Sequence, residues 1–473
     1  MPYNRNKPKL NKTKKVINPR VLIIKILYRL DHDNAFLNIL LNHYFSFYQF
    51  DQKDKALIQE IAFGVTRNRK KLDYIIDQFL VNKTRVLDFN TRNILRVGIY
   101  QIFYLDRIPH YAICNESVQL SRKFHLQKKA SFINAVLRNA IRKMDKIKWP
   151  ERYPETVEGI STFYSYPESM VRRWMIRFGL KKCLKICQES NKKANLCLRI
   201  NTLNISQENF LEKLDQQNMT FKLGQYLPKD AVIVRKMIEI EHSSMYQEGL
   251  FSIQDEASLL VARLLHPKAG EIVFDMCSAP GGKTTHMAQI MSNQGKIIAF
   301  DKYTDRLNLI KKESQRIGID IIECKAEDSS SFQPRYQEKA DKVLVDVPCS
   351  GTGVIRKKPD LKWKKFNKQS IKRLTDLQLK ILEVASKYLK IGGELVYSTC
   401  SIEQEENEGV ISCFLRKNKN FKLVSPDNTL EDTVTKLTKR YQSTIRVAIQ
   451  TIPGISGKNI DGFFMVKIKK RAR

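Results

Sequence analysis

The sequence has no continuous apolar run of about 18 residues, so it offers no segment long enough to cross a membrane. It has no Cys-x-x-Cys pair, and its nine cysteines are an odd number, which favours neither a disulfide framework nor a zinc site. The start, residues 1–15, is basic but has no apolar core, unlike a secretory signal. We therefore expect a cytoplasmic chain with reduced thiols, no metal and no membrane association.

Acidic residues are scarce relative to basic ones. Asp and Glu number 49 against 83 Lys and Arg, which gives a formal net charge of +34. Such an excess repels itself and is typical of proteins that bind a polyanion, most often nucleic acid. Hydrophobic residues make up 42% of the chain, enough to exclude wholesale disorder, and the length of 473 residues predicts about two to four domains.

Proline and glycine are scarce in the first third, where apolar residues recur at helical spacing. We expect a basic tail over residues 1–17 and an all-α domain over 18–145, with helices near 91–105, 112–124 and 130–142. A small α+β module is expected over 146–240, with a helix at 168–179 and strands at 196–200 and 231–234.

From residue 241 to 473, strand-like runs alternate with helical ones. Strands are expected at 271–275, 296–300, 319–323, 342–347 and 394–398, and helices at 282–291, 303–317 and 370–389. This alternation predicts a doubly wound, Rossmann-like α/β domain with a parallel sheet. Two late runs, 444–450 and 462–469, are expected to add antiparallel edge strands.

The first motif joins a predicted strand to a glycine-rich turn and a helix. It comprises Asp275, Met276, Cys277, Ser278, Ala279, Pro280, Gly281, Gly282, Lys283 and Thr284. Ligands of open α/β sheets bind at such turns, because the carboxyl ends of the strands meet there. A phosphate loop would need glycine where Cys277 stands, and the dinucleotide pattern G-x-G-x-x-G is absent. An adenosyl-cofactor loop remains.

Two acids support that interpretation. Asp301 ends the next predicted strand, about 20 residues after the turn, where a carboxylate can bond a ribose hydroxyl. Asp328 follows the third strand and can face an adenine amino group.

Two further predicted strands end near cysteines. The run Asp346-Val347-Pro348-Cys349 leads into a glycine-rich loop, and Tyr397-Ser398-Thr399-Cys400 ends another strand at the same edge. One such cysteine is more often an inert core residue, but the pair indicates thiol chemistry with one nucleophile and one helper. Beside a methyl-donating cofactor, a thiolate can add to carbon 6 of a pyrimidine and so activate carbon 5. A carboxyl group such as Asp346 can stabilise that adduct at ring nitrogen 3.

These motifs resemble those of the RNA 5-methylcytosine methyltransferases of the NOL1/NOP2/Sun class. The similarity includes residues 199–203, 252–258, 353–363 and 461–464, while 64–67, 95–101 and 134–138 resemble the fold of transcription antitermination factor B. The combination, over about residues 18–470, is typical of bacterial 16S rRNA cytosine-5 methyltransferases.

The resemblance implies a function and residue roles. S-adenosyl-L-methionine would bind the loop from Cys277 to Lys283, with Asp301 at the ribose, Asp328 near the adenine and Asp346 near the methionine end. Cys400 would be the nucleophile, and Cys349 would assist release of the product. The substrate would be 16S rRNA, methylated before the ribosome is fully assembled. The enzyme would be a monomer whose N-terminal helical domain binds RNA.

Three alternatives stay open on the sequence. The same chemistry on tRNA or another rRNA site would leave the motifs unchanged. A phosphate-loop NTPase would need the missing glycine at position 277. A non-catalytic RNA-binding or antitermination factor would have no use for paired cysteines at strand ends.

Overall fold

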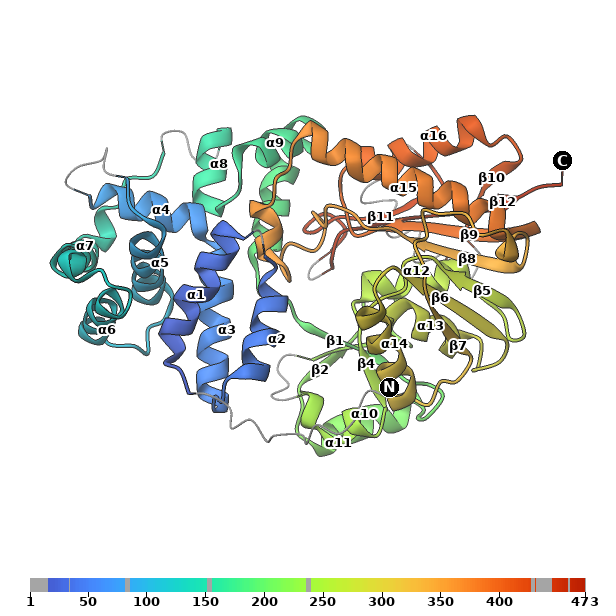
Figure 1. Ribbon diagram of the computed structural model, residues 1–473, viewed down its shortest axis with the longest axis horizontal. Coiled ribbons are helices and arrows are strands. Elements are labelled where there is room, and N and C mark those ends of the chain that lie inside the picture. The colour runs from blue at the N-terminus through green and yellow to red at the C-terminus, as the bar shows by residue number, and fades with distance from the viewer. Residues whose placement is uncertain are drawn as a thin grey trace, which may run out of the picture. The chain divides into compact units, whose positions relative to one another are not determined.

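The computed structural model describes residues 16–33, 35–80, 86–150, 155–234, 240–426, 430, 445–457 and 460–472. The chain forms two compact units, one of residues 1–177 with 358–364 and one of 178–357 with 365–473 (Figure 1). Within the described ranges, no helix combines the length and hydrophobicity that crossing a bilayer requires.

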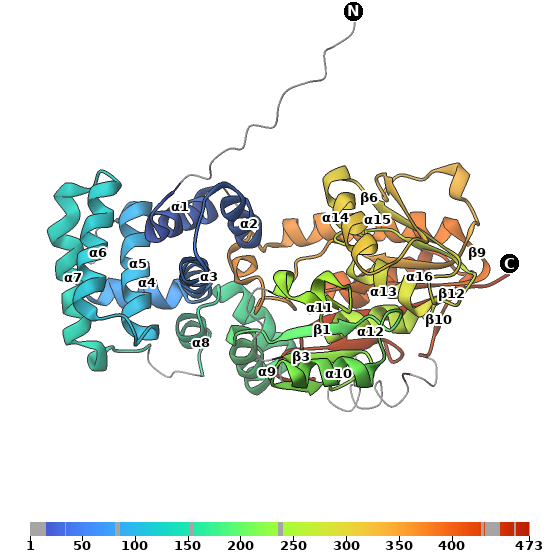
Figure 2. The same ribbon diagram turned by 90° about the horizontal axis from the view of Figure 1, so that it is seen from below.

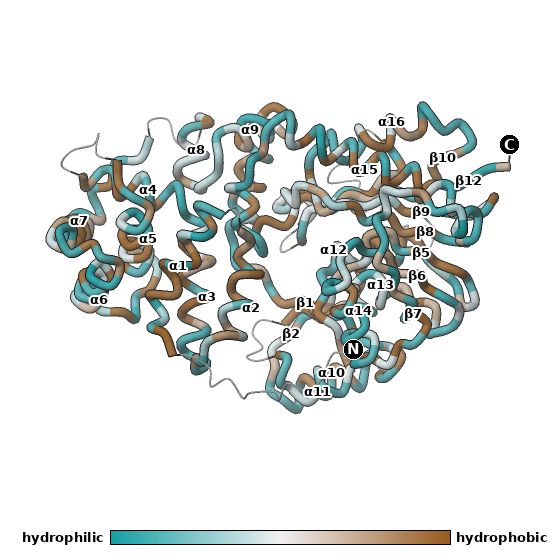
Figure 3. Tube along the Cα trace, in the orientation of Figure 1, coloured by the Kyte–Doolittle hydropathy of each residue, from teal (hydrophilic) through white to brown (hydrophobic). Residues whose placement is uncertain are grey.

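The first unit is helical. Its helices are α1 (Pro19–His32), α2 (Leu37–Phe47), α3 (Gln52–Arg67), α4 (Arg69–Gln78), α5 (Phe89–Tyr104), α6 (His110–Lys123), α7 (Ala130–Arg142), α8 (Val157–Tyr164) and the first part of α9 (Glu168–Asn191). Side chains of Asn18, Asp51 and Asp88 accept hydrogen bonds from backbone amides at the starts of α1, α3 and α5, which otherwise lack partners. The helices expected at 91–105, 112–124 and 130–142 are confirmed as α5, α6 and α7. Along these helices apolar and polar positions alternate (Figure 3), and the apolar ones form one core.

Residues 358–364, which contain the short 3₁₀-helix η5 (Pro359–Trp363), belong to this helical unit. The fully buried ammonium of Lys362 donates to the carbonyl oxygens of Arg67 (3.0 Å) and Ser165 (3.1 Å), at the carboxyl ends of α3 and α8. Trp363 Nε1 donates to the carbonyl oxygen of Thr66 at 2.8 Å. A cation at a helix carboxyl end satisfies carbonyls that have no partner within the helix. This segment therefore closes two helices of the unit.

The second unit begins with a small antiparallel sheet. Its elements are β1 (Leu196–Ile200), α10 (Gln207–Gln216), β2 (Phe221–Leu223), β3 (Ala231–Val234), α11 (Ser244–Gln247) and β4 (Phe251–Ile253), with strand order β2-β3-β1-β4. Helix α10 lies beside β1 and β3 (Figure 2). Its apolar side chains share one core with those of the two strands. The strands expected at 196–200 and 231–234 are confirmed. The helix expected at 168–179 is confirmed, since the first helical part of α9 ends at a kink at Gly179 (φ 75°); a second helical part, which was not expected, continues to Asn191.

The large sheet has the order β10-β12-β9-β8-β5-β6-β7, with β11 paired to β12. Its elements are α12 (Glu256–Leu265), β5 (Ile272–Asp275), α13 (Gly282–Ile290), β6 (Lys296–Asp301), α14 (Thr304–Arg316), β7 (Ile322–Ala326), β8 (Ala340–Asp346), α15 (Lys368–Tyr388), β9 (Leu389–Thr399), α16 (Val410–Lys417), β10 (Phe421–Val424), β11 (Ile449–Thr451) and β12 (Phe463–Lys470). Strands β5 to β9 are parallel, and β10 to β12 are antiparallel. Helices α15 and α16 cover one face and α12 to α14 the other (Figure 1), as in a doubly wound fold.

Two expectations about this sheet are wrong in detail. β7 starts at Ile322 rather than residue 319, because its pairing runs from Ile297↔Ile322 to Asp301↔Ala326 along the full length of β6. The run at 462–469 forms β12, which is not an edge strand: it lies between β9 and β10, and nearly all of it is buried. The edge is the short β10, whose mixed residues gave no strand signal. Of the other late run, expected at 444–450, only residues 449 and 450 are strand, in β11; residues 445–448 are not in a strand, and residue 444 lies outside the described residues.

Candidate functional site

The chain order reverses between β5 and β8, which lie side by side in the sheet. Strands β6 and β7 continue from β5 in one direction, whereas β8 and β9 lie in the other. Ligands of such sheets bind outside the carboxyl ends of the strands at this reversal. Almost every residue that the sequence singled out follows one of these five strand ends.

The glycine-rich turn after β5 is tightly built. Ser278 donates to the carbonyl oxygen of Phe300 through both its amide and its hydroxyl, each at 2.9 Å. Gly281 has φ 108°, and a Cβ there would lie 3.1 Å from Ile310, so the position requires glycine. Cys277 is half-buried, and burial raises the pKa of its thiol well above the ordinary value. A neutral Cys277 fits a lining residue rather than a nucleophile.

Asp275, the last residue of β5, is buried beneath this turn. Thr284 Oγ1 donates to its Oδ2 at 2.7 Å, while its Oδ1 is buried without a hydrogen-bond partner among the described residues. Burial, helped by repulsion from Asp346, raises the pKa of Asp275 to about 7.

The two acids beyond β6 and β7 differ in exposure. The side chain of Asp301 is 5% exposed, accepts from the amide of Tyr303 at 3.0 Å and lies 3.3 Å from Arg306. Asp328 is 41% exposed; it accepts from the amide and hydroxyl of Ser330 at 2.9 and 2.7 Å, and these bonds lower its pKa. Both carboxylates therefore stand at the edge where the glycine-rich turn opens.

Lys283 and Asp346 form an ion pair at the reversal. Lys283 Nζ donates to Asp346 Oδ2 at 2.7 Å, and Ser398 Oγ donates to Asp346 Oδ1 at 2.7 Å from the neighbouring strand. The Lys283 ammonium also lies 5.2 Å from the ring centre of Phe463. Burial alone would lower the pKa of Lys283, but the charge of Asp346 outweighs it and the pKa is raised.

The two cysteines after β8 and β9 meet. Cys349 Sγ and Cys400 Sγ are 3.2 Å apart, and both thiols are reduced. The hydrogen bond with Cys400 and burial raise the pKa of Cys349 well above its ordinary value, whereas Cys400 is among the groups that raise the pKa of Lys283. The positive charge of Lys283 thus acts on Cys400, and the pair is asymmetric.

Motifs far apart in the sequence meet beside the cysteines. The amide of Gly353 donates to the carbonyl oxygen of Cys400 at 3.0 Å, and the amide of Gly462 donates to that of Gly353 at 2.8 Å. A Cβ at Gly353 would lie 2.0 Å from the Gly462 oxygen, so only glycine fits this crossing. The backbone around residue 353 and that of residues 461–464 are therefore fixed relative to the Cys400 loop.

A buried charge cluster anchors the same segments. Arg356 pairs with Asp461, and Lys357 pairs with Asp255 and lies 3.5 Å from Asp461. Burial and the charge of Asp255 raise the pKa of Asp461 to about 7. Three segments that carry the sequence resemblance are thus in contact although they lie far apart in the sequence. They are 252–258, 353–363 and 461–464.

Sequence reasoning missed several residues of the site. Arg199 of β1 is fully buried and donates to the carbonyl oxygen of Gly282 at 2.7 Å and to Thr285 Oγ1 at 3.0 Å, which fixes the start of α13 beneath Lys283. Glu406 and Asn407, beyond β9, reach back to the cysteine loops. The one available signal was the repeated Cys-Ser pair at 349–350 and 400–401, which was not interpreted.

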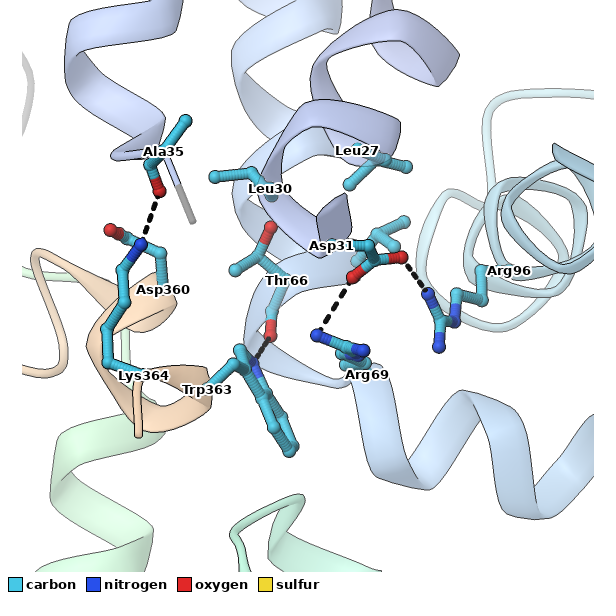
Figure 4. A pocket seen from close by; sticks show the side chains of 11 residues that line it. Leu27, Leu30, Asp31, Ala35, Thr66, Arg69, Arg96, Asp360, Trp363 and Lys364 are labelled. Carbon is cyan, nitrogen blue, oxygen red and sulfur yellow. Dashed lines mark hydrogen bonds and ion pairs between the residues drawn. The ribbon is translucent and has the colours of Figure 1, made fainter. Parts of the chain in front are cut away.

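The structure also has a pocket in the helical unit, with about 370 Å³ of empty space that is partly open to solvent (Figure 4). Its lining includes none of the sequence-predicted site residues. Asp31 pairs with Arg69 and Arg96, each at 2.8 Å, and Lys364 donates to the carbonyl oxygen of Ala35 at 2.6 Å. These charged groups already bind one another or the backbone. The pocket is therefore better explained by the packing of residues 358–364 against the helices of this unit than by a ligand. Among the described residues, no group of His, Cys, Asp and Glu side chains is arranged to hold a metal ion.

Three family models match the chain. They are 16S rRNA methyltransferase RsmB/F over residues 262–469, the NusB family over 17–142 and a ferredoxin-like domain of RsmF/B-like methyltransferases over 166–241.

The chain is 33% identical to a probable ribosomal RNA small subunit methyltransferase B of Bacillus subtilis, over 96% of this chain and 98% of that protein. It is 30% identical to a protein of the same name from Synechocystis, over 86% and 91% of the two chains. The crystal structure of PH0851 superposes with a TM-score of 0.77 at 26% identity, covering 97% of this chain and all of that one. The chain thus belongs to the 16S rRNA methyltransferase RsmB/F family, whose methyl donor is S-adenosyl-L-methionine.

Proposed function

We propose that the protein transfers a methyl group to carbon 5 of a cytosine in small-subunit rRNA through a covalent adduct on Cys400. The observation that carries the proposal is the thiol pair, 3.2 Å apart, at the same sheet edge as the Lys283–Asp346 ion pair. Methyl transfer to a ring nitrogen or a ribose oxygen needs no thiol. Methyl transfer to carbon 5 of cytosine needs a nucleophile such as a thiolate, because carbon 5 becomes nucleophilic only after addition at carbon 6, and a second thiol beside the first can assist its release.

The residues around the glycine-rich turn fit the methyl donor. The backbone from Cys277 to Lys283 follows the end of β5, and the positive φ of Gly281 shapes the tight turn that leads into α13. Asp301 would hold the ribose hydroxyls and Asp328 the adenine amino group. When bound, S-adenosyl-L-methionine supplies a methyl group on a positively charged sulfur, and Asp346 would lie near that methionine end.

Cys400 is the proposed nucleophile. Its thiolate would add to carbon 6 of the cytosine and form a carbon–sulfur bond, which makes carbon 5 electron-rich enough to take the methyl group. Lys283 favours the thiolate because its ammonium, held by Asp346, interacts with Cys400. The same ion pair offers a hydrogen-bond donor and an acceptor to ring nitrogen 3 and the exocyclic amino group of the base.

Cys349 is proposed to assist product release. After methylation, a water molecule takes the proton of carbon 5, the electrons of that bond restore the ring double bond, and the carbon–sulfur bond to Cys400 breaks with its electron pair on sulfur. The raised pKa of Cys349 keeps its thiol neutral while Cys400 reacts. Since its sulfur lies 3.2 Å from Cys400, this thiol can donate a hydrogen bond to the departing Cys400 thiolate and so favour release of the product.

The helical unit is proposed to grip RNA, since phosphate contacts position a nucleic acid while the pocket selects one base. We retain the division into a basic tail (1–17), a helical domain (18–145), a small α+β module (146–240) and a catalytic domain (241–473). A target base flipped out of its stack would reach Cys400. We place the reaction in the cytoplasm, on 16S rRNA before the subunit is fully assembled, by a monomer.

The RNA grip has its own test. Replacing the exposed Lys25, Lys53 and Lys123 by Gln should weaken rRNA binding and flatten its salt dependence. Each lost phosphate contact lowers the slope of log affinity against log salt by about 0.7–0.9. Unchanged slopes in filter binding at several salt concentrations would contradict RNA binding by these three side chains.

The function is tested by bisulfite sequencing of total RNA from a strain lacking the protein. We expect one cytosine of 16S rRNA to lose its protection from deamination and regain it when the wild-type protein, but not Cys400→Ala, is restored. If a cytosine of tRNA or of another rRNA loses protection instead, the proposed reaction holds and the proposed substrate is wrong. If every protected cytosine stays protected in the deletion strain, the protein does not methylate carbon 5 of cytosine.

A further inference from the structure

Each of the two cysteines is followed by a serine, and both serines bind one carboxylate. Ser350 donates to Glu406 through its amide (to Oε1, 2.8 Å) and its hydroxyl. Ser401 Oγ donates to Glu406 Oε2 at 2.5 Å, and the two serine oxygens are 3.1 Å apart. Glu406 therefore joins the Cys349 loop to the Cys400 loop one residue away from each sulfur.

Neighbouring side chains and a π-helical turn hold the Glu406 carboxylate in place. Glu406 is fully buried and lies in a π-helical turn, η6 (Glu405–Gly409). Gln378 of α15 donates to its Oε1 at 3.0 Å and also to the carbonyl oxygen of Pro348 at 2.9 Å, while Tyr397 OH donates to the Glu406 carbonyl at 2.6 Å. Isolated π-turns are rare and occur mostly at functional sites.

A second residue of the same π-helical turn, Asn407, also binds the Cys400 loop. Asn407 Nδ2 donates to the carbonyl oxygen of Ser401 at 3.0 Å, and Thr399 Oγ1 donates to Asn407 Oδ1 at 2.6 Å. Two consecutive residues of the π-turn, Glu406 and Asn407, therefore both bind the cysteine loops.

The charge of Glu406 also distinguishes the two thiols. Four donors converge on its two oxygens, the arrangement of an ionised carboxylate, which only accepts. This charge is among the causes that raise the pKa of Cys349, after the bond with Cys400 and burial. Lys283 provides the opposite charge on the Cys400 side.

We propose that Glu406 is a positioning residue that holds the sulfurs of Cys349 and Cys400 in register by binding Ser350 and Ser401, the residue after each of them. Its carboxylate, buried beside the same loops, also repels negative charge on Cys349. This inference rests on the proposed covalent mechanism and adds to it a group that touches neither base nor cofactor. No atom is transferred to or from Glu406; it acts through the two serines and through its field.

The test compares Glu406→Gln with Glu405→Gln, a neighbouring exposed acid on the same turn. Alkylation of each cysteine by iodoacetamide is followed against pH by mass spectrometry in the full-length protein, without RNA. Removing the negative charge should shift the alkylation profile of Cys349 to lower pH, while Glu405→Gln leaves it unmoved. Separately measured turnover on rRNA should fall by about a hundredfold with cofactor affinity unchanged, since small misplacements of reacting groups are costly.

A second variant covers the case in which Glu406→Gln does not fold. Ser350→Ala combined with Ser401→Ala removes the donors and leaves the carboxylate, so it should lower the yield of a Cys349–Cys400 disulfide under mild oxidation and reduce turnover. An unmoved Cys349 profile in folded Glu406→Gln, or wild-type disulfide yield and turnover in the double serine variant, would overturn the inference. A shifted profile in a protein that methylates no cytosine would uphold the positioning of the thiols and refute the proposed function instead.

Discussion

Two regions of the molecule each contain a largely buried, positively charged side chain: Arg96 in the helical unit and Lys283 at the proposed catalytic edge, where Cys349 and Cys400 also lie. The two side chains differ in how many of their N–H groups form hydrogen bonds. Arg96 of α5 donates to Asp73 through two nitrogens (2.8 and 2.7 Å), to Asp31 (2.8 Å) and to Asn93 (2.8 Å), so four of its five N–H groups are engaged. Lys283 at the catalytic edge has three N–H groups and a single hydrogen bond within the described residues, to Asp346.

The difference separates a structural ion pair from one that can act on a substrate. Four of the five N–H groups of Arg96 are engaged, and they join α1, α4 and α5. Lys283, by contrast, keeps donors beyond its bond to Asp346, and it lies beside the turn proposed to bind the cofactor. Changing each charge should therefore affect stability in one region and chemistry in the other.

The largest effect is expected for Arg96→Met. It removes one partner from Asp31, which is buried and still pairs with Arg69, and one from Asp73, which is 26% exposed. Breaking a buried pair costs about 3–5 kcal/mol of unfolding free energy, and we expect the lower end of that range. Urea denaturation measures this, with Arg29→Met in an exposed pair as the control that should change little. Wild-type stability in Arg96→Met would remove the distinction between the two regions.

Lys283→Met should do the reverse. We expect turnover to fall by about 10²–10³-fold, because a preorganised positive charge beside the reacting groups is lost. The loss of unfolding free energy should be smaller than in Arg96→Met, since Asp346 keeps its bond from Ser398 and is 25% exposed. Turnover is read by transfer of a radiolabelled methyl group to rRNA. Stability loss equal to that of Arg96→Met, with turnover retained, would show a structural role.

Asp301→Ala tests the cofactor side of the edge. Loss of a buried charged partner for the ribose hydroxyls should weaken S-adenosyl-L-methionine binding by about 1.5–3 kcal/mol, roughly ten- to a hundredfold in affinity. Isothermal titration calorimetry measures it, with the exposed Asp305→Ala as the matched control. Equal affinities in the two variants would move the ribose contact to another residue.

The smallest effect is a pH dependence. Because burial raises the pKa of Asp275 to about 7, the folded protein binds a proton that the unfolded chain releases near its ordinary pKa of 3.8. Stability should therefore fall as pH rises between these values, by about 1 kcal/mol from pH 6 to 7 for this group, and level off above the folded pKa. Asp275→Asn should reduce that slope while Asp320→Asn on the surface does not. Asp461, whose pKa is also about 7, accounts for a remaining slope.

Periodicity and motif order predicted the layers of the molecule, because both depend on neighbouring residues. Helices α5 to α7, the strands around the cofactor turn and the positions of Cys349 and Cys400 were all visible in this way. The interior place of β12 was not, since strand order depends on pairings such as Val466↔Tyr397 that no local pattern encodes.

The support of the catalytic residues was equally hidden. Glu406 stands in an acidic run, Glu403 to Glu408, which in a sequence resembles a solvated surface. Only the π-turn and the sheet bring it under both cysteine loops. Lys362 likewise looked like one more basic residue of a charged chain, yet it is buried and closes two helices.

The central claim, covalent catalysis by Cys400 with release assisted by Cys349, is tested most directly with Cys349→Ala. Incubated with 16S rRNA and S-adenosyl-L-methionine, this variant should accumulate a protein–RNA adduct that survives a denaturing gel. Adding Cys400→Ala to the same chain should abolish the adduct. An adduct of undiminished yield in the double variant would contradict the assignment of Cys400 as the nucleophile.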